Sequence, residues 1–545
     1  MGMPKKNSKP PAFCGNFLWV TKNTPQKHGG FRVRKIFADR SRARKGRILK
    51  RLDRFNYPDD MSKPMLQAAN VGFELAGRVV GTAYGGIGLV HQLAQRLDLA
   101  VEINQRLSVF KIHLPYFESD HVLNLVYNTI SDGRCLEDLE LRRQDEGYLN
   151  MLGAVRIPDP TTAGDFCRRF NPHHIEALHD AFDAARRKVW AFQPREFFDE
   201  ACLDVDGILV PTMGECKEGM EYSYKGIWGY HALVVSLRNT GEVLRLVNRP
   251  GNRPSHEGAA PRLDQAIDLC RAAGFRRIRM FGDTDFSQTV YLDGWHEQGV
   301  IFTFGLDVSP ARWLNAEDLP KSAWEPLIRP PHYVPQGAPR GRRKRVKQEV
   351  VEQRQFKDIR LVNEWVAEMK YRPSACRHTY RLIIVRKNLV VNDPKQGRLF
   401  DDYRYFIYIS NDWESTPTEI VFSANDRCNQ ENILAQLRAL RAMRAPLDTL
   451  LSNWAYMLIT AQAWNIKAWL ALLLPEPSGR WCEKHAEEKD RVLRMEFRTF
   501  VNTFIRIPCQ IVRTGRKILH RLLAWNQWQS VFFRLEARLS RPLRC

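Results

Sequence analysis

The length, composition and charge of the chain limit what it can be. Its 545 residues exceed what one hydrophobic core ordinarily supports, so we expect two to four domains. Hydrophobic residues make up 44% of the sequence, which is enough for packed cores. Lys and Arg number 83 against 61 Asp and Glu. The resulting formal charge of +22 predicts a polyanionic partner, because each neutralised phosphate releases bound counterions.

The 11 cysteines are scattered, and none of them stands in C-x-x-C spacing. A disulfide framework and a zinc ribbon are therefore disfavoured, and a reducing cytoplasm fits best. Residues 1–11 are polar and basic with no apolar stretch after them, so we expect no signal peptide. The uncharged run 449–466 contains Asn and Gln and is read as a buried helix. The expected partner is therefore nucleic acid, with no membrane and no small-molecule substrate.

The N-terminal part of the chain is read as a basic arm followed by helices. Residues 1–62 are rich in Pro, Gly, Lys and Arg. This segment is either a flexible arm or short basic helix that contacts DNA phosphates through Arg42, Arg44 and Lys45, or a solvated tail. Residues from about 67 to 190 show helical periodicity, and Asp159 begins a turn that is followed by a capped helix start. We therefore expect residues 63–195 to form a helical DNA-binding domain.

From residue 198 the pattern changes to strands. Three expected strands come first, and a turn at 238–241 joins the second and third as a hairpin. The strands and the helices that follow are, in order, strands 201–210, 230–237 and 242–248, helix 259–273, strand 277–282, helix 286–298 and strand 300–306. This order predicts the mixed five-stranded α/β sheet of an RNase H-like catalytic core. Its first part would be residues 196–306 and its second part, with the glutamate helix, residues 419–475.

A β-rich insertion is expected to interrupt this core over residues 307–418. It begins with a Pro- and Arg-rich loop whose basic residues are candidates for DNA contact: Arg342, Arg343, Lys344 and Arg345. Strand-like runs follow at 380–391 and 403–410. After the core resumes, residues 476–545 are expected to form a basic helical C-terminal region.

Acidic residues at strand ends are the candidates for catalysis. Nucleases and strand transferases use two metal ions about 3.5–4 Å apart, and Mg²⁺ prefers hard oxygen ligands. Asp204 and Asp206 are two apart on the first strand, so both point to one face. Such an acidic pair is costly in an apolar strand unless a positive group lies there. We favour Asp206 as the ligand, because Gly207 beside it would leave room for metal and phosphate. Asp204 stays as the alternative ligand or as a supporting acceptor.

Two further acids complete the set. Asp283 ends the strand 277–282, and α/β sheets place their sites at the carboxyl ends of strands. Glu431 lies on an expected helix, with Arg427 four residues before it and Arg438 seven after it, so the three share one stripe. That stripe is either a surface salt-bridge ladder or a metal ligand beside two arginines that hold phosphates.

These residues together resemble the DDE transposases of bacterial insertion sequences, in the IS-four-like superfamily and its IS-thirteen-eighty branch. The superfamily signature runs tyrosine, two residues, arginine, three residues, glutamate, six residues and lysine. Arg427, Glu431 and Arg438 fall at those spacings, whereas Ala424 replaces the tyrosine and Arg438 the lysine. Other stretches similar to this branch are 119–123, 135–138, 157–166, 224–226, 229–231 and 249–252.

The resemblance implies a metal-dependent endonuclease and strand transferase that cleaves the ends of its own element and joins the freed 3′-OH to target DNA. Two Mg²⁺ ions, replaceable by Mn²⁺, would be held by Asp206, Asp283 and Glu431. It also implies binding of terminal inverted repeats, a homodimer on DNA, and a bacterial, nucleoid-associated location in the cytoplasm. Lys225 and His231, placed on the second strand, could approach the site, Lys225 as a DNA contact. The alternatives are a catalytically inactive, domesticated DNA-binding protein and a structure-specific nuclease without strand transfer.

Overall fold

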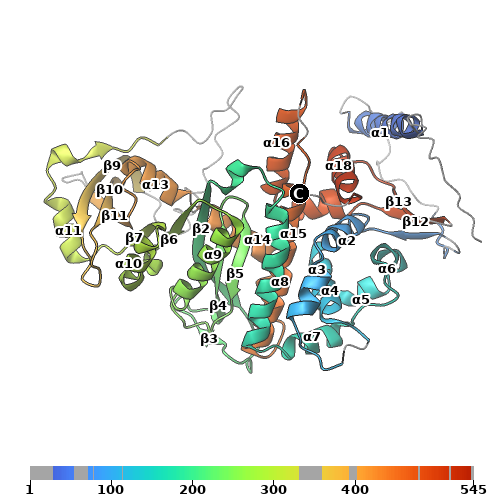
Figure 1. The fold of residues 1–545 in the computed structure, drawn as a ribbon, viewed down its shortest axis with the longest axis horizontal. Coiled ribbons are helices and arrows are strands. Elements are labelled where there is room, and N and C mark those ends of the chain that lie inside the picture. Colours follow the sequence, from blue (N-terminus) through green and yellow to red (C-terminus); the bar gives the residue numbers. More distant parts are fainter. Residues whose placement is uncertain are drawn as a thin grey trace, which may run out of the picture. The chain divides into compact units, whose positions relative to one another are not determined.

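The computed structural model describes residues 29–53 and 71–541, apart from 76, 78, 113–114, 330–358, 392–401, 427, 477–478 and 515–516. The chain forms two compact units, residues 1–74 and 75–545. In the first unit, α1 (Gly29–Leu52) is a helix of 24 residues, longer than the short helix considered above (Figure 1). Arg42 on this helix pairs with Asp39 at 3.0 Å. Residues 1–28 and 54–62 of the predicted arm lie outside the described residues.

The second unit begins with a short strand, β1 (Val80–Thr82), and then a series of helices. They are α2 (Ile87–Arg96), α3 (Leu99–Arg106), α4 (Glu118–Ile130), α5 (Leu139–Arg143), α6 (Glu146–Leu152), α7 (Pro160–Arg168), α8 (Pro172–Trp190) and the 3₁₀ turn η1 (Arg195–Phe198). The predicted cap is confirmed, because the Asp159 carboxylate accepts a hydrogen bond from the backbone N–H of Thr162 at 2.9 Å. The helical pattern is thus confirmed over these elements, while β1 was missed.

A large mixed sheet forms the centre of the second unit. Its first strands are β2 (Glu200–Pro211), β3 (Glu221–Tyr222), β4 (Trp228–Leu237), β5 (Glu242–Val247), β6 (Arg277–Gly282) and β7 (Ile301–Leu306). Strands β2, β6 and β7 run parallel to one another, and β4 pairs antiparallel with β2 and with β5. The connections are α9 (Ala259–Ala273), the 3₁₀ turn η2 (Thr284–Phe286) and α10 (Thr289–Glu297). The predicted strand–helix alternation is confirmed, to the residue for α9 and β6.

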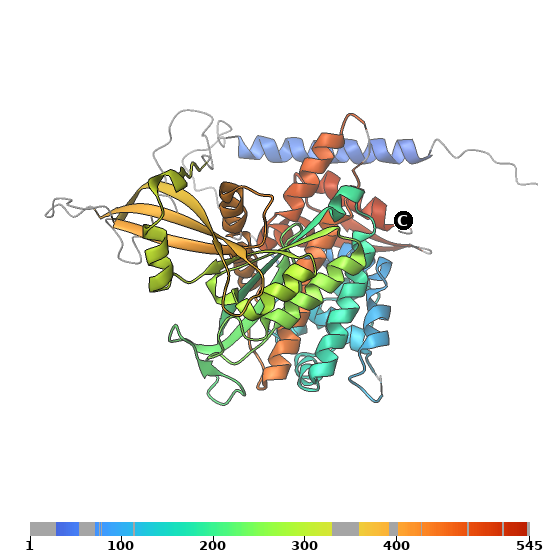
Figure 2. The same ribbon diagram turned by 60° about the vertical axis from the view of Figure 1, so that its left-hand side comes forward.

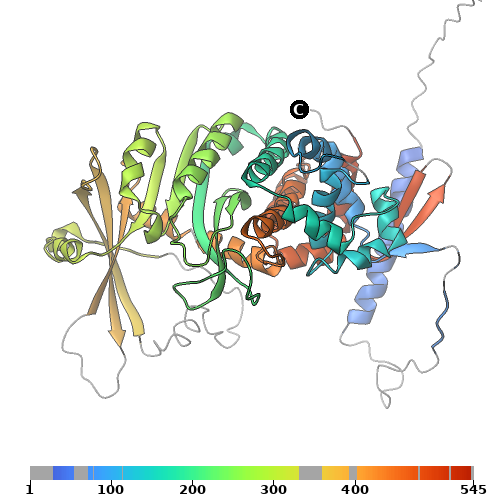
Figure 3. The same cartoon turned by 90° about the horizontal axis from the view of Figure 1, so that it is seen from below.

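Strands from the expected insertion continue the same sheet. After α11 (Pro310–Glu317) and the 3₁₀ turn η3 (Lys321–Ala323) come β8 (Glu325–Pro326), β9 (Ile359–Tyr371), β10 (Tyr380–Val391) and β11 (Asp402–Ser410). β11 pairs antiparallel with β7, and the ten strands from β2 to β11 form one sheet, with β5 attached to β4. Figure 3 shows β9, β10 and β11 as long strands at one end of this sheet. The two strands predicted here are confirmed, but they extend the central sheet.

Helices cover both faces of the sheet. On one face lies α9, whose Gln265 carbonyl accepts a hydrogen bond from Arg245 of β5 at 3.4 Å. On the other face lie α13 (Pro417–Asn425), which packs on β7, β9 and β10, and α14 (Cys428–Ala439), which packs on β2. The end of α13 and the start of α14 therefore lie on the same face of the sheet as each other.

The long helix α15 (Leu450–Leu472) covers the free edge of the sheet beside α8 (Figure 2). Asn465 accepts from the N–H of Val243 at 2.8 Å and donates to its carbonyl at 2.9 Å. An edge strand whose backbone groups are satisfied in this way cannot pair with another chain there. The predicted buried helix at 449–466 is confirmed. No helix in the described residues combines the length and apolarity needed to span a bilayer.

The C-terminal part corrects an expectation. Residues 476–545 contain the helices α16 (Cys482–Leu493), α17 (Phe497–Phe500) and α18 (Gln529–Leu539) and the π-helical turn η4 (Val501–Ile505), as predicted. They also contain the strands β12 (Cys509–Thr514) and β13 (Lys517–Leu522), which pair with each other and, through β12, with β1. The prediction of helix throughout this basic region is wrong for the hairpin, where the β-branched run Ile511–Val512 and Thr514 favours strand.

Candidate active site

Asp206 and Asp283 lie at matching positions on neighbouring strands. β2 and β6 are parallel with Asp204 beside Phe281, so two residues further on Asp206 comes beside Asp283. Asp283 follows β6 directly in extended backbone, with φ −79° and ψ −171°. Neighbouring strands are about 4.8 Å apart, and residues two apart project from the same face. The two carboxylates therefore belong to one face and one edge of the sheet.

Helix α14 covers the face from which Asp206 projects. Gln430, the residue before Glu431, shows which face α14 covers. It donates a hydrogen bond to the carbonyl of Val234 at 3.2 Å and accepts one from the hydroxyl of Ser236. In the antiparallel pair β2–β4, Val234 lies opposite Asp206 and Ser236 opposite Asp204. Directly opposed residues point to the same face. The Ser236 hydroxyl thus shows that α14 lies on the Asp206 face.

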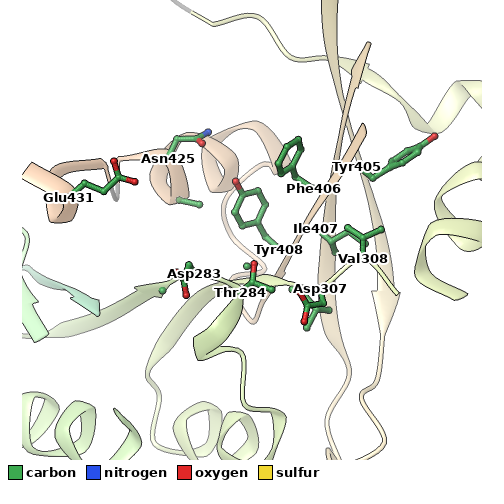
Figure 4. A pocket seen from close by; sticks show the side chains of 14 residues that line it. Asp283, Thr284, Asp307, Val308, Tyr405, Phe406, Ile407, Tyr408, Asn425 and Glu431 are labelled. Atoms are coloured by element: carbon green, nitrogen blue, oxygen red, sulfur yellow. The ribbon is translucent and has the colours of Figure 1, made fainter. Parts of the chain in front are cut away.

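Asp283 and Glu431 line the same pocket, of about 410 Å³. Its walls come from the end of β6, the end of β7, β11, the end of α13 and the start of α14. Figure 4 shows Glu431 on α14 at one side, Asp283 below it at the end of β6, and Tyr408 rising from β11 toward Asn425. The lining residues are Gly282, Asp283, Thr284, Gly305, Leu306, Asp307, Val308, Tyr405, Phe406, Ile407, Tyr408, Ala424, Asn425 and Glu431.

Asp206 is not one of the residues that line this pocket, although it lies beside Asp283 in the sheet. Within the described ranges, no three side chains of His, Cys, Asp and Glu are close enough together to hold a metal ion. The structure therefore places Asp283 and Glu431 in one pocket and Asp206 toward the same end of the sheet, without joining all three carboxylates.

Asp204 has a different environment from Asp206. Its side chain is fully buried, and both of its oxygens accept from Arg238, at 2.8 Å from Nε and 2.6 Å from Nη2. Arg238 also donates to the carbonyl of Ser423 in α13 at 2.9 Å and lies 3.9 Å from the centre of the Phe281 ring. Burial lowers the pKa of Arg238, but the hydrogen bonds and charge of Asp204 outweigh burial and raise it overall. This ion pair ties β2, β4 and α13 together.

The space at Gly207 was interpreted wrongly. A Cβ atom built on Gly207 would lie 2.4 Å from Nε2 of His231, so the imidazole already occupies that side of the strand. Gly207 alternates with Asp206 and faces away from the acids. His231 is on β4, buried, with Nδ1 2.8 Å from the carbonyl of Arg253, and burial lowers its pKa. Room for a phosphate therefore does not come from Gly207.

The basic residues expected around the site differ in how close they lie to the acids. Arg438 on α14 donates to the carbonyl of Leu209 on β2 at 3.3 Å, three residues beyond Asp206. Lys225 is exposed in the turn before β4, not on the strand as expected, with its Nζ 5.2 Å from the Tyr224 ring centre. The expected contacts that lie outside the described residues are Arg427, Arg342, Arg343, Lys344 and Arg345. Arg42, Arg44 and Lys45 belong to the first unit.

Sequence reasoning did not single out several pocket residues. Tyr408 and Asn425 come from β11 and the end of α13, and neither stands in a motif with the acids. The Asp204–Arg238 pair joins residues 34 apart on adjacent strands. The need of a buried acid for a positive partner was the one available signal for it.

Comparison with known proteins identifies the family. The family model described as transposase DDE domain group 1 matches residues 63–543. The chain belongs to this family of DDE transposases. No curated protein matches the sequence. Among solved structures, the chain is similar to a piggyBac transposase synaptic complex with hairpin DNA, at 9% identity and a TM-score of 0.33, over 78% of this chain and 83% of that one.

Proposed function

We propose that this DDE transposase family member binds the terminal inverted repeats of its own element, cleaves the ends by metal-dependent hydrolysis and joins the 3′-OH ends to target DNA. The observation that carries the proposal is the acidic edge of the sheet. There, Asp206 and Asp283 each lie two residues beyond the last recorded β2–β6 pair, Asp204 with Phe281, and Asp283 shares a pocket with Glu431. Asp206 is favoured over Asp204 because both oxygens of Asp204 accept from Arg238.

The donor set fits a hard divalent cation. Asp206, Asp283 and Glu431 present carboxylate oxygens, the ligands that Mg²⁺ and Mn²⁺ take, and Asp283 and Glu431 open onto one pocket. When bound, two Mg²⁺ ions would supply charge stabilisation for an in-line displacement at phosphorus. Glu431 is exposed in the first turn of α14, and in this proposal its side chain rotates toward the aspartates when the ions bind.

The remaining chain would deliver the DNA. In this proposal, Arg438 and Arg427 hold backbone phosphates beside the acids, and the residues Lys225, Arg342, Arg343, Lys344, Arg345, Arg42, Arg44 and Lys45 contact DNA further out. The strand order β5-β4-β2-β6-β7 supports an RNase H-like core in residues 196–306 and 419–475. An insertion at 307–418, a basic arm at 1–62, a DNA-binding region at 63–195 and a C-terminal region at 476–545 would flank it.

The finer identity rests on the sequence resemblance alone. We propose the IS-four-like superfamily and its IS-thirteen-eighty branch, a bacterial, nucleoid-associated protein in the cytoplasm, and a homodimer on DNA, since two ends must be processed together. A transposase-derived DNA-binding protein without catalysis is the second candidate. It is favoured by Ala424 in place of the signature tyrosine and by the acids not meeting as a group of three.

An end-cleavage assay separates these candidates. A plasmid carrying the gene with its flanking DNA is incubated with the purified full chain and Mg²⁺, and cleavage and joining of the ends are followed. Asp206→Asn, Asp283→Asn and Glu431→Gln are each expected to abolish cleavage while DNA binding persists. The matched control is Asp285→Asn, because Asp285 is an exposed acid two residues from Asp283 that does not line the pocket. Binding without cleavage by the unaltered chain would favour the inactive candidate, and cleavage without joining would favour a nuclease.

A further inference from the structure

A row of four residues crosses the sheet at the level of the acids. Asp206 on β2 lies beside Asp283, which follows β6. β6 and β7 are parallel with Gly282 beside Phe304, so Asp283 comes beside Gly305. Gly305 in turn pairs directly with Tyr408 in the antiparallel pair of β7 and β11. Residues that lie side by side in a sheet project from the same face. Tyr408 therefore projects from the acidic face, two strands beyond Asp283.

The position between Tyr408 and Asp283 carries no side chain. A Cβ on Gly305 would lie 2.9 Å from the backbone nitrogen and 3.0 Å from Oγ1 of Thr284, so no larger residue fits there without a shift. At about 4.8 Å per strand, the Tyr408 and Asp283 backbones are about 10 Å apart. Thr284 fills the space directly above Gly305. Room for a phosphate group comes instead from the pocket of about 410 Å³ that Tyr408, Asp283 and Glu431 line together. Opposite, Ala424 of α13 contributes only a methyl group to the pocket wall.

The side chains of the two β11 tyrosines that line the pocket lie on opposite faces of the strand. Tyr405 donates to the Glu317 carboxylate of α11, and its side chain alternates to the other face. Tyr408 is half-buried, and its ring stands up from β11 with the hydroxyl toward the end of α13 (Figure 4). Its phenol is thus on the same face as Asp283 and Glu431.

We propose that the Tyr408 hydroxyl donates a hydrogen bond to a non-bridging oxygen of the DNA backbone at the acidic site, on the scissile phosphate or its immediate neighbour. Tyrosine hydroxyls are regular donors to DNA phosphates, which fix the register of the duplex on the protein. A neutral donor suits this position, because it adds no charge that would pair with the carboxylates needed beside it. The proposal rests on the function proposed above and adds a substrate contact from β11.

The test is a chemical double-mutant cycle. End cleavage is measured under single-turnover conditions for the full chain and for Tyr408→Phe, which keeps the ring and removes the hydroxyl. The DNA duplexes carry the element end with one neutral methylphosphonate at a time, at the scissile phosphate and at each neighbour. A hydrogen bond to a charged group predicts that Tyr408→Phe cleaves about 10- to 100-fold more slowly on unmodified DNA. At a contacted neighbouring phosphate, the neutral substitution should slow the unaltered chain but slow Tyr408→Phe no further. At the scissile phosphate, where the substitution also removes an oxygen that the metal ions would hold, it should slow Tyr408→Phe by a smaller factor than the unaltered chain.

The control is Tyr371→Phe on β9, whose hydroxyl lies 3.4 Å from Arg312 outside the pocket. It should cleave at the rate of the unaltered chain and keep every methylphosphonate effect, and the melting temperatures of all variants check their folding. Cleavage by Tyr408→Phe at the normal rate would overturn the proposal. If cleavage is then lost only in Tyr408→Ala, the ring of Tyr408 and not its hydroxyl is what the reaction needs. The proposal would also be overturned if, at every phosphate tested, the methylphosphonate slowed Tyr408→Phe by the same factor as the unaltered chain. If Asp283→Asn cleaves normally, the proposed function fails; if Asp283→Asn is inactive and Tyr408→Phe is not, only this inference fails.

Discussion

Asp204 and Asp206 are two residues apart on one face of β2, yet their substitution is expected to have opposite consequences. Asp204 is fully buried, and its partner Arg238 is 12% exposed, with hydrogen bonds of 2.6 and 2.8 Å between them. Removing one member of a buried ion pair leaves an uncompensated charge and costs about 3–5 kcal/mol. Asp204→Ala should therefore lower the free energy of unfolding by about that amount. Asp206→Ala should change it by less than about 1 kcal/mol, because Asp206 is only half-buried.

Two measurements on the same variants decide this prediction. Urea unfolding gives the free energy of unfolding, and end cleavage at a temperature where every variant is folded gives activity. Asp204→Ala should be unstable but still cleave, whereas Asp206→Ala should be stable and inactive. The double variant Asp204→Leu with Arg238→Met should be more stable than Asp204→Ala alone, because no charge is left buried. A stable, inactive Asp204→Ala beside an active Asp206→Ala would refute the assignment.

Two further predictions concern packing and pH. Gly207→Ala places a Cβ 2.4 Å from Nε2 of His231, so it should lower the free energy of unfolding by about 1–3 kcal/mol in urea. Adding His231→Ala should restore part of that free energy. An unchanged urea midpoint for Gly207→Ala would contradict this close packing. Burial lowers the pKa of Lys467 from its ordinary 10.5 to about 7. The unfolded chain then binds more protons than the folded one between these values, so stability should rise with pH from 7 to 10 by up to about 1.4 kcal/mol per unit. Lys467→Met should flatten this rise. If the free energy of unfolding of the variant rises equally steeply with pH, Lys467 is not the cause.

Local sequence patterns predicted many of the helices and strands. The helix 259–273 and the strands 277–282 and 380–391 were predicted to the residue, because turns and runs of apolar residues bound them clearly. The pairing of β11 with β7 was not predictable, since it joins residues about a hundred positions apart and no local period records it. The hairpin β12–β13 contradicts the predicted helical region, although its β-branched residues favour strand.

The candidate site shows the same division. Asp283 and Glu431 could be named from sequence, and they line one pocket. The choice of Asp206 was supported by a reason that the structure removes, because His231 fills the space at Gly207. The better reason for choosing Asp206 is that Arg238 already binds Asp204, and this pairing depends on the register of β2 and β4. Tyr408 likewise reaches the acidic face only through the order of four strands.

The central claim is that Asp206, Asp283 and Glu431 act as one set of ligands for divalent ions. Electron paramagnetic resonance of Mn²⁺ titrated into the full chain, with the end duplex bound, measures this directly without relying on turnover. The account predicts that Asp206→Asn, Asp283→Asn and Glu431→Gln each lose bound Mn²⁺ while Asp285→Asn keeps it. Undiminished Mn²⁺ binding by Glu431→Gln would contradict it.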